Sequence, residues 1–335
     1  MSHSSHKFQG VILLASILLS MQCGSSSFDL LALVRELWSF LTCVDCADKT
    51  LATIILFELR MPRTILAAMC GGALAAAGVI SQGLFRNALA SPSILGTSAG
   101  GGLFAVLAFY LLPVVSHQFT LPLSAFAGAL LASVLVLSCA RSVSIERLLL
   151  VGFALNTFFA AVTSLYVYLA LEEFHKVSAI MNWLLGGFAG RSWQHIQFML
   201  LPLSIGLILA YRIGTRLDIL SLGEEVASSM NVDTRKLRYQ AVLSIALLVG
   251  ASVAVAGALP FIGLMIPHLA RMWHGANHRN LLIKSFLYGS SFVLVIDSFT
   301  REVASTHELN VGIVTAMIGG VFFLAMLVFK RPDTV

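Results

Sequence analysis

The sequence predicts an all-α, polytopic membrane protein with about ten transmembrane helices. Hydrophobic residues make up 58% of the 335 residues and charged residues only 11%, whereas roughly a quarter of a soluble domain is charged. Apolar runs of about 20 residues, long enough to cross a bilayer, recur along the chain. A soluble fold of this length could not bury so much apolar surface. We expect one transmembrane domain over residues 1–335.

The apolar runs follow one another with short polar connections. The first run also resembles a signal peptide, but retaining it gives an even number of spans and places both termini on one side. In chain order, we place the spans at residues 8–24, 64–85, 94–115, 119–140, 148–171, 194–211, 237–258, 260–273, 281–299 and 309–329.

The basic residues indicate the orientation of these spans. With a cytoplasmic N-terminus, 14 of the 21 lysines and arginines fall on the cytoplasmic side and seven on the outer side. This bias favours cytoplasmic N- and C-termini. The net charge of +5 is spread over short loops in the manner of topology signals, so we do not expect nucleic acid as a partner.

Small residues and prolines gather in several segments of the predicted spans. Span 260–273 is short and contains Pro260 and Pro267, so it must be buried in protein or line a cavity. The small residues of segment 91–102 fit either tight helix packing or the lining of a path. Segments 71–78 and 250–257 resemble each other on oppositely directed spans, as in an inverted-topology duplication.

The most polar interruption is the loop at residues 217–232, which predicts a short cytoplasmic helix. Glu224 and Glu225 would lie in its first turn, where the helix dipole favours acidic residues. Asn231 suits the left-handed position that ends a helix. Because the segment begins with acidic residues, we expect it to contact a protein partner rather than the membrane surface.

No catalytic constellation is present in the sequence, and we do not expect an enzyme. None of the six lysines follows a glycine, so the phosphate-binding loop of ATPases is absent and we expect no cofactor on this chain. Asp297 and Arg301 lie four residues apart on one helix face, where we favour a structural ion pair over a proton relay.

Two further groups of residues raise the possibility of a metal site. His268, His274 and His278 do not share one helical face, so we interpret them as solvated loop histidines rather than metal ligands. Cys43 and Cys46 give only a weak metal signal, and a local disulfide or no role at all fits them better.

Several motifs together are similar to the permease subunit of ABC importers for iron–siderophores, haem and vitamin B12. The similarity runs from about residue 60 to the C-terminus. In order, the motifs are Arg60-Met-Pro-Arg63, 82–92, 95–100, 148–156, 183–190, 222–227, 260–271 and 309–316.

This resemblance implies a fold and a set of partners. The fold is the inverted-repeat permease of type II ABC importers, in the bacterial inner membrane. The partners are a second permease chain (a copy or a paralogue), two ATP-binding subunits that carry ATP and Mg, a periplasmic or lipid-anchored substrate-binding protein, and membrane lipid. The expected substrate is a ferric siderophore, haem or cobalamin. The rival interpretation is an ion-coupled secondary transporter of a small solute.

The resemblance also assigns roles to individual residues. It places the binding-protein docking site at Arg60, Arg63 and Arg301. The translocation path and gate would involve Asn87 and Leu89, and a second constriction Ser144, Ile145 and Glu146. Where the family usually has Asn-Pro-Leu, this chain has Ala88 in the middle position, which predicts a less rigid loop. The residues that would couple to the ATPase are Leu222, Gly223, Glu224, Glu225, Ala227 and Asn231.

Overall fold

A computed structural model describes residues 2–23, 51–112, 117–139, 145–303 and 309–329, and this part of the chain is helical. The first elements are α1 (Ser2–Gln22), α3 (Leu51–Ile54), the π-helical turn η1 (Ile55–Arg60), α4 (Met61–Leu84), the 3₁₀ turn η2 (Pro92–Leu95), α5 (Thr97–Leu111), α6 (His117–Cys139) and α7 (Ile145–Leu169). They are followed by α8 (Phe174–Leu184), α9 (Trp193–Ser221), α10 (Glu224–Ser229), α11 (Thr234–Ala256), α12 (Ile262–His274), α13 (His278–Val303) and α14 (Val311–Phe329).

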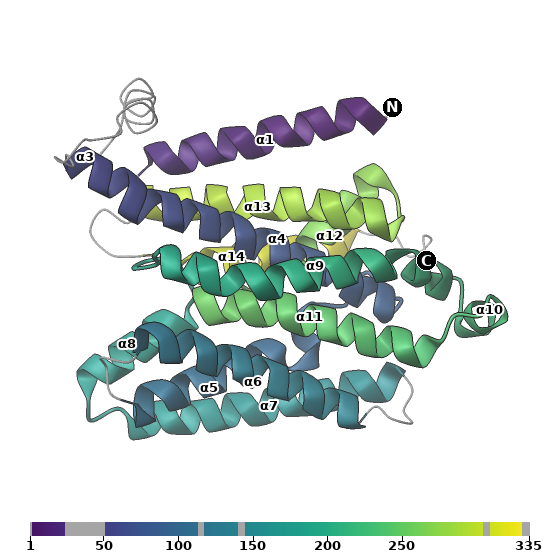
Figure 1. Cartoon of the computed structure of the whole chain (residues 1–335). Helices are drawn as coiled ribbons and strands as arrows, with labels where there is room; N and C mark the ends of the chain where they lie inside the picture. Colours follow the sequence, from purple (N-terminus) through teal and green to yellow (C-terminus); the bar gives the residue numbers. More distant parts are fainter. Residues whose placement is uncertain (1, 24–50, 113–116, 140–144, 304–308, 330–335) are drawn as a thin grey trace.

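Each predicted span coincides with one helix of the structure, which confirms the membrane fold class. Within the described residues, seven helical stretches are long and apolar enough to cross a membrane, judged by length and composition. Helices α1 and α5 contain shorter apolar stretches, and α12 has only 13 residues. Helix α1 packs along α13 (Figure 1), so the first apolar run is an integral part of the bundle.

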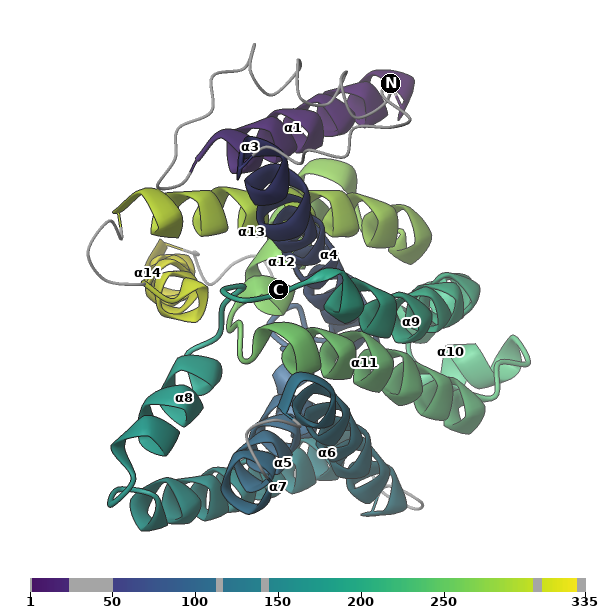
Figure 2. The ribbon, with the colours of Figure 1, turned by 60° about the vertical axis from the view of Figure 1, so that its left-hand side comes forward.

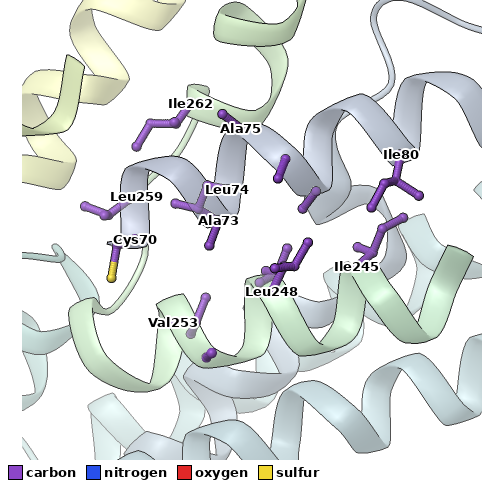
Figure 3. Packing of buried hydrophobic residues seen from close by; sticks show 14 of the residues in the cluster. Cys70, Ala73, Leu74, Ala75, Ile80, Ile245, Leu248, Val253, Leu259 and Ile262 are labelled. Atoms are coloured by element: carbon purple, nitrogen blue, oxygen red, sulfur yellow. The ribbon is translucent and has the colours of Figure 1, made fainter. Parts of the chain in front are cut away.

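Helices α4 and α11 cross at the centre of the bundle. Helices α5 to α8 lie on one side of this pair, and α1 and α13 lie on the other (Figures 1 and 2). Buried side chains of α4, including Leu74 and Ile80, face Ile245 and Leu248 of α11 (Figure 3). Alanine and glycine dominate the buried part of α4, and such small residues let helix backbones approach closely.

Two glycines of α4 show how close these contacts are. A Cβ atom at Gly71 would collide with the backbone of Gly289 in α13, and one at Gly78 would collide with the backbone of Gly263 in α12. Gly100 in α5 likewise packs against Gly128 in α6. The small residues at the start of α5 therefore serve tight packing. The predicted duplication remains a prediction.

The predicted burial of the proline-containing span is confirmed. Helix α12 begins after Phe261, whose positive φ of 64° is rare for a residue with a side chain. Pro267 lies inside the helix, and residues 262–267 are buried. The structure therefore encloses this short, proline-containing helix in protein.

One predicted boundary was wrong, and one helix was not predicted. Helix α9 continues to Ser221, ten residues beyond the predicted end at residue 211, so the first part of the predicted loop 217–232 belongs to α9. Helix α8 was not predicted as an element. Cys43 and Cys46 lie outside the described residues.

The interpretation of the three histidines as solvated loop residues was also wrong. His278 is the buried first residue of α13, and its backbone N–H donates to Asp218 Oδ1 over 2.9 Å. Its ring Nδ1 lies 2.6 Å from the same oxygen. His274 bonds Gln9 and Tyr288, and His268 lies edge-to-face against a phenylalanine ring. All three belong to α12 or α13 because these helices leave only a short turn between them.

Candidate functional site

The predicted site residues lie at two opposite ends of the helix bundle. At one end, Gln9 near the start of α1 meets His274, and α10 projects from the same end (Figure 1). At the other end, Ser20 near the end of α1 bonds Thr64 over 2.9 Å and Arg301 over 2.8 Å. The predicted coupling helix and the predicted docking arginines are therefore separated by the length of the spans.

The local sequence defines both ends of α10. It begins after Gly223, whose φ of 124° favours glycine, and Glu224 and Glu225 occupy its first turn. Asn231 has a φ of 59°, and the N–H of Val232 donates to the carbonyl of Ala227 over 2.9 Å. This closure satisfies a carbonyl at the end of the helix. The predicted short helix and its left-handed end are confirmed.

One face of α10 is apolar and exposed. Val226 is 39% exposed and Met230, at the end of the helix, 55%, and a spacing of four places these two on one side of the helix. Leu222, which is 68% exposed, lies just before Gly223 and outside the helix. Ala227 is fully buried and anchors the opposite side. Sequence reasoning missed Val226 and Met230 as contact candidates, although their spacing within a polar loop was a readable signal. Glu225 is exposed beside this face.

Glu224 is held within the chain. Its Oε1 accepts a hydrogen bond from Arg238 Nη2 of α11 over 2.5 Å, and Arg86 Nη2 lies 3.9 Å from the same oxygen. Arg86 belongs to the connection between α4 and η2, which also carries Asn87 and Leu89. Glu224 thus joins α10 both to α11 and to the predicted gate loop.

The predicted gate loop is closed by its own hydrogen bonds. Asn87 N–H donates to the carbonyl of Gln82 over 3.1 Å, and its side-chain Oδ1 accepts from Leu89 N–H over 2.8 Å. Asparagine forms such turns readily, so the loop is held although Ala88 replaces the usual proline. Of the second predicted constriction, Ser144 lies outside the described residues, and Ile145 and Glu146 form the start of α7.

At the opposite end, two arginines converge on one buried carboxylate. Asp297 in α13 has a fully buried side chain. Arg63 donates to Asp297 Oδ1 from Nε over 3.0 Å and from Nη2 over 2.8 Å, while Arg301 Nε lies 3.2 Å from Oδ2. The predicted Asp297–Arg301 ion pair is confirmed, and Arg63 adds a second cation to it. Because both arginines neutralise the carboxylate, the arrangement is that of a structural ion cluster.

The same end of the bundle receives the C-terminus of α1. Arg60 Nη1 donates to the carbonyl of Met21 over 2.6 Å, and Arg301 Nη2 donates to the carbonyl of Ser20 over 2.8 Å. The last carbonyls of a helix lack intrahelical partners and carry partial negative charge, so arginines suit them. Arg60, Arg63 and Arg301 therefore gather around the end of α1 and Asp297, on elements that also carry Glu58 and Glu302.

The three arginines differ in accessibility. The Arg63 side chain is 23% exposed and that of Arg301 10%, whereas Arg60 is buried. Among the three, Arg63 is therefore best placed to meet another molecule.

Among the described residues, no group of three His, Cys, Asp or Glu side chains is arranged to hold a metal ion.

The family model of the FecCD transport family matches residues 12–329. The chain belongs to the FecCD transport family. Among curated relatives, it is 35% identical to the uncharacterized ABC transporter permease protein YvrB of Bacillus subtilis, over 94% of this chain and 91% of the relative. It is 37% identical to the vitamin B12 import system permease protein BtuC of Vibrio vulnificus, over 82% of each chain. It is 33% identical to the hemin transport system permease protein HmuU of Yersinia pestis, over 97% of this chain and 96% of the relative.

A solved structure shows the same fold. The chain superposes with a TM-score of 0.83 and 30% identity on a metal-chelate type ABC transporter in an inward-facing conformation, covering 96% of this chain and 98% of the other. FecCD proteins are membrane-embedded permease subunits of ABC importers rather than the catalytic subunits. Membership implies ATPase and substrate-binding partners, and an ion-coupled secondary transporter is not favoured.

Proposed function

We propose that this chain carries a ferric siderophore, haem or cobalamin inward across a bacterial inner membrane, driven by two separate ATP-binding subunits. The observation that carries the proposal is the exposed apolar face of α10 at one end of a bundle whose other end gathers Arg60, Arg63 and Arg301. The relatives named for vitamin B12 and hemin import support the substrate class. In this orientation, the α10 end and both termini are cytoplasmic.

Helix α10 would contact the ATP-binding subunit. An apolar strip outside the spans is formed by Val226 and Met230 on one side of α10, with Leu222 exposed just before the helix. An apolar helix face of this kind docks into an apolar groove of a partner. The exposed carboxylate of Glu225 lies beside the strip and would favour a basic rim around that groove. These features suit a protein partner better than an anionic membrane surface.

Glu224 would pass movement of α10 to the gate. When ATP-driven closure of the ATPase pair displaces α10, the contacts of Glu224 with Arg238 and Arg86 displace α11 and the loop that carries Asn87 and Leu89. Rigid-body movement of packed helices is an established route between two conformations. We therefore assign Glu224 a positioning role inside the permease and assign the ATPase contact to the apolar strip and Glu225.

The end that carries Arg60, Arg63 and Arg301 would receive the substrate-binding protein, in its periplasmic or lipid-anchored form. Arg63 would offer part of its guanidinium to an acidic residue of that protein while Asp297 holds the rest in place. Arg301 and Arg60 would support the same site from beneath. Charge pairing of this kind steers the encounter and fixes the register of a transient complex.

A second permease chain, either a copy or a paralogue, would cover the apolar faces of α7 and α14. Both helices are poorly buried. Within the apolar 18-residue stretch of each helix, only 17% of the residues are buried in α7 and 28% in α14. Large side chains on them are exposed, namely Leu150, Phe153, Phe158, Met317, Val321 and Leu324. A dimer of permeases would place the translocation path between the two chains.

A pull-down of the tagged chain from mildly solubilised native membranes tests the function. We expect stoichiometric recovery of an ATPase subunit, and the variant Met230→Lys should lose this subunit because a charge enters the apolar contact. Met272→Lys is the matched control, since Met272 is 70% exposed at the same end but lies on α12. Recovery of the chain alone from a complex shown to be intact and transport-active would refute the importer assignment.

A further inference from the structure

An apolar groove lies between α9 and α13, toward the end of the bundle that carries α10. Its volume is about 410 Å³. Leu207, Ile208 and Tyr211 line it from α9, and Leu282, Ile283 and Phe286 line it from α13. On each helix these residues repeat at intervals of three and four, so each helix offers one continuous apolar face.

The bottom of the groove packs directly against α4. The ring of Phe286 packs against α4 at Gly72, where even a Cβ atom would meet it within 3 Å. Leu282 is buried, whereas Ile208 and Ile283 are exposed along the walls. The groove is therefore formed by the packing of α4, α9 and α13, and it opens away from the bundle.

Two arginines stand at the mouth of the groove. Arg212 lines it directly and is exposed. Arg279 donates from Nε to the carbonyl of Tyr211 over 3.2 Å, and its guanidinium lies 5.0 Å from the centre of the Tyr211 ring. Gly214 leaves the space through which the Arg279 side chain crosses α9. The carboxylate nearest in the chain, Asp218, is already paired with His278.

We propose that this groove binds one anionic phospholipid of the cytoplasmic leaflet. Its acyl chain would lie against the apolar faces of α9 and α13, and its phosphate would pair with Arg212 and Arg279. A groove that is apolar at the depth of the spans and basic at its cytoplasmic mouth matches the division of a lipid into chain and headgroup. A zwitterionic lipid would bring an ammonium group toward the same arginines, so an anionic headgroup binds better.

This inference rests on the orientation in the proposed function, which makes the α10 end cytoplasmic. A lipid at this position would contact the cytoplasmic end of α9, which directly precedes α10. It would therefore stabilise the position of α10, the helix that contacts the ATPase in the proposed function. The relation to α10 gives the site a place in the transport cycle, but binding itself requires neither ATP nor substrate.

Native mass spectrometry of the full chain, purified in mild detergent, tests the site. The chain is titrated with phosphatidylglycerol and with phosphatidylcholine of the same acyl chains. We expect one phosphatidylglycerol to be retained at concentrations where phosphatidylcholine is lost. The variant Arg212→Gln/Arg279→Gln should weaken phosphatidylglycerol binding about 30-fold, equivalent to about 2 kcal/mol for two surface arginines.

Matched variants separate this site from general lipid adhesion. Arg235→Gln/Lys236→Gln removes two exposed basic residues from the same end of the bundle and should leave binding unchanged. Ile283→Trp fills the groove but keeps both arginines, and it should also release the lipid while thermal unfolding shows that the chain is folded. Equal retention of both lipids, or unchanged binding in the arginine variant, would overturn the proposal. Either result would leave the importer assignment to be decided by the ATPase pull-down.

Discussion

Replacing Asp297 by asparagine gives the sharpest test of the ion cluster that Asp297 forms with Arg63 and Arg301. The substitution keeps the shape of the side chain and removes the negative charge that Arg63 and Arg301 share. Removing one partner of a buried ion pair costs about 3–5 kcal/mol. The Arg63 side chain is 23% exposed and can turn toward water, so its contribution to the loss of stability must be discounted. Arg301 is 10% exposed and tied to α1. We therefore expect a loss of about 3 kcal/mol.

Unfolding of the purified chain in detergent measures this loss. The control is Glu302→Gln, because Glu302 is an exposed acidic residue of the same helix and its replacement should change stability by about 0.5 kcal/mol or less. The double variant Asp297→Asn/Arg301→Gln should be less destabilised than the sum of its single variants, since it no longer buries an unpaired guanidinium. A loss below about 1 kcal/mol in Asp297→Asn would refute the reasoning.

Three further predictions address docking, coupling and packing. Arg63→Glu should weaken binding of the substrate-binding protein to the permease in proteoliposomes while membrane insertion stays normal, and unchanged binding would contradict the docking assignment. Arg86→Gln should lower the substrate transported per ATP hydrolysed without releasing the ATPase, because it cuts the link from Glu224 to the gate loop; a transport ratio equal to that of the unaltered chain would argue against this link. Gly78→Ala should cost about 1–3 kcal/mol of stability through a backbone collision. Gly320→Ala, at an open position, should cost nothing, and equal effects of the two would exclude close packing as the cause.

The spans could be predicted because a long run of apolar residues indicates that lipid surrounds that part of the chain. The errors have equally local causes. Arg212 and Arg216 made the last turns of α9 look like a loop, although a helix continues beyond the membrane when its backbone remains hydrogen-bonded. Helix α8 has 11 residues, which is too short to register as a span.

The short helix α10 was also predictable from neighbouring residues. Glu224 and Glu225 suit its first turn and Asn231 suits its end, because these preferences depend on the backbone of the same segment. The direction of each side chain depends on distant helices. Glu224 suggested a contact with the ATPase, which stays a prediction, and only the structure shows that Arg238 and Arg86 approach the same carboxylate within the chain.

The sequence by itself determined that this protein is a membrane-spanning helical protein with a short polar helix between two spans, because solvent preference and helix ends are local properties. Only the tertiary structure decided which charges meet. Arg63 and Asp297 are 234 residues apart in the chain. The buried His278 bonds Asp218, which is 60 residues away. Such pairs depend on how whole helices pack, and close contacts between glycines such as Gly71 and Gly289 set that packing.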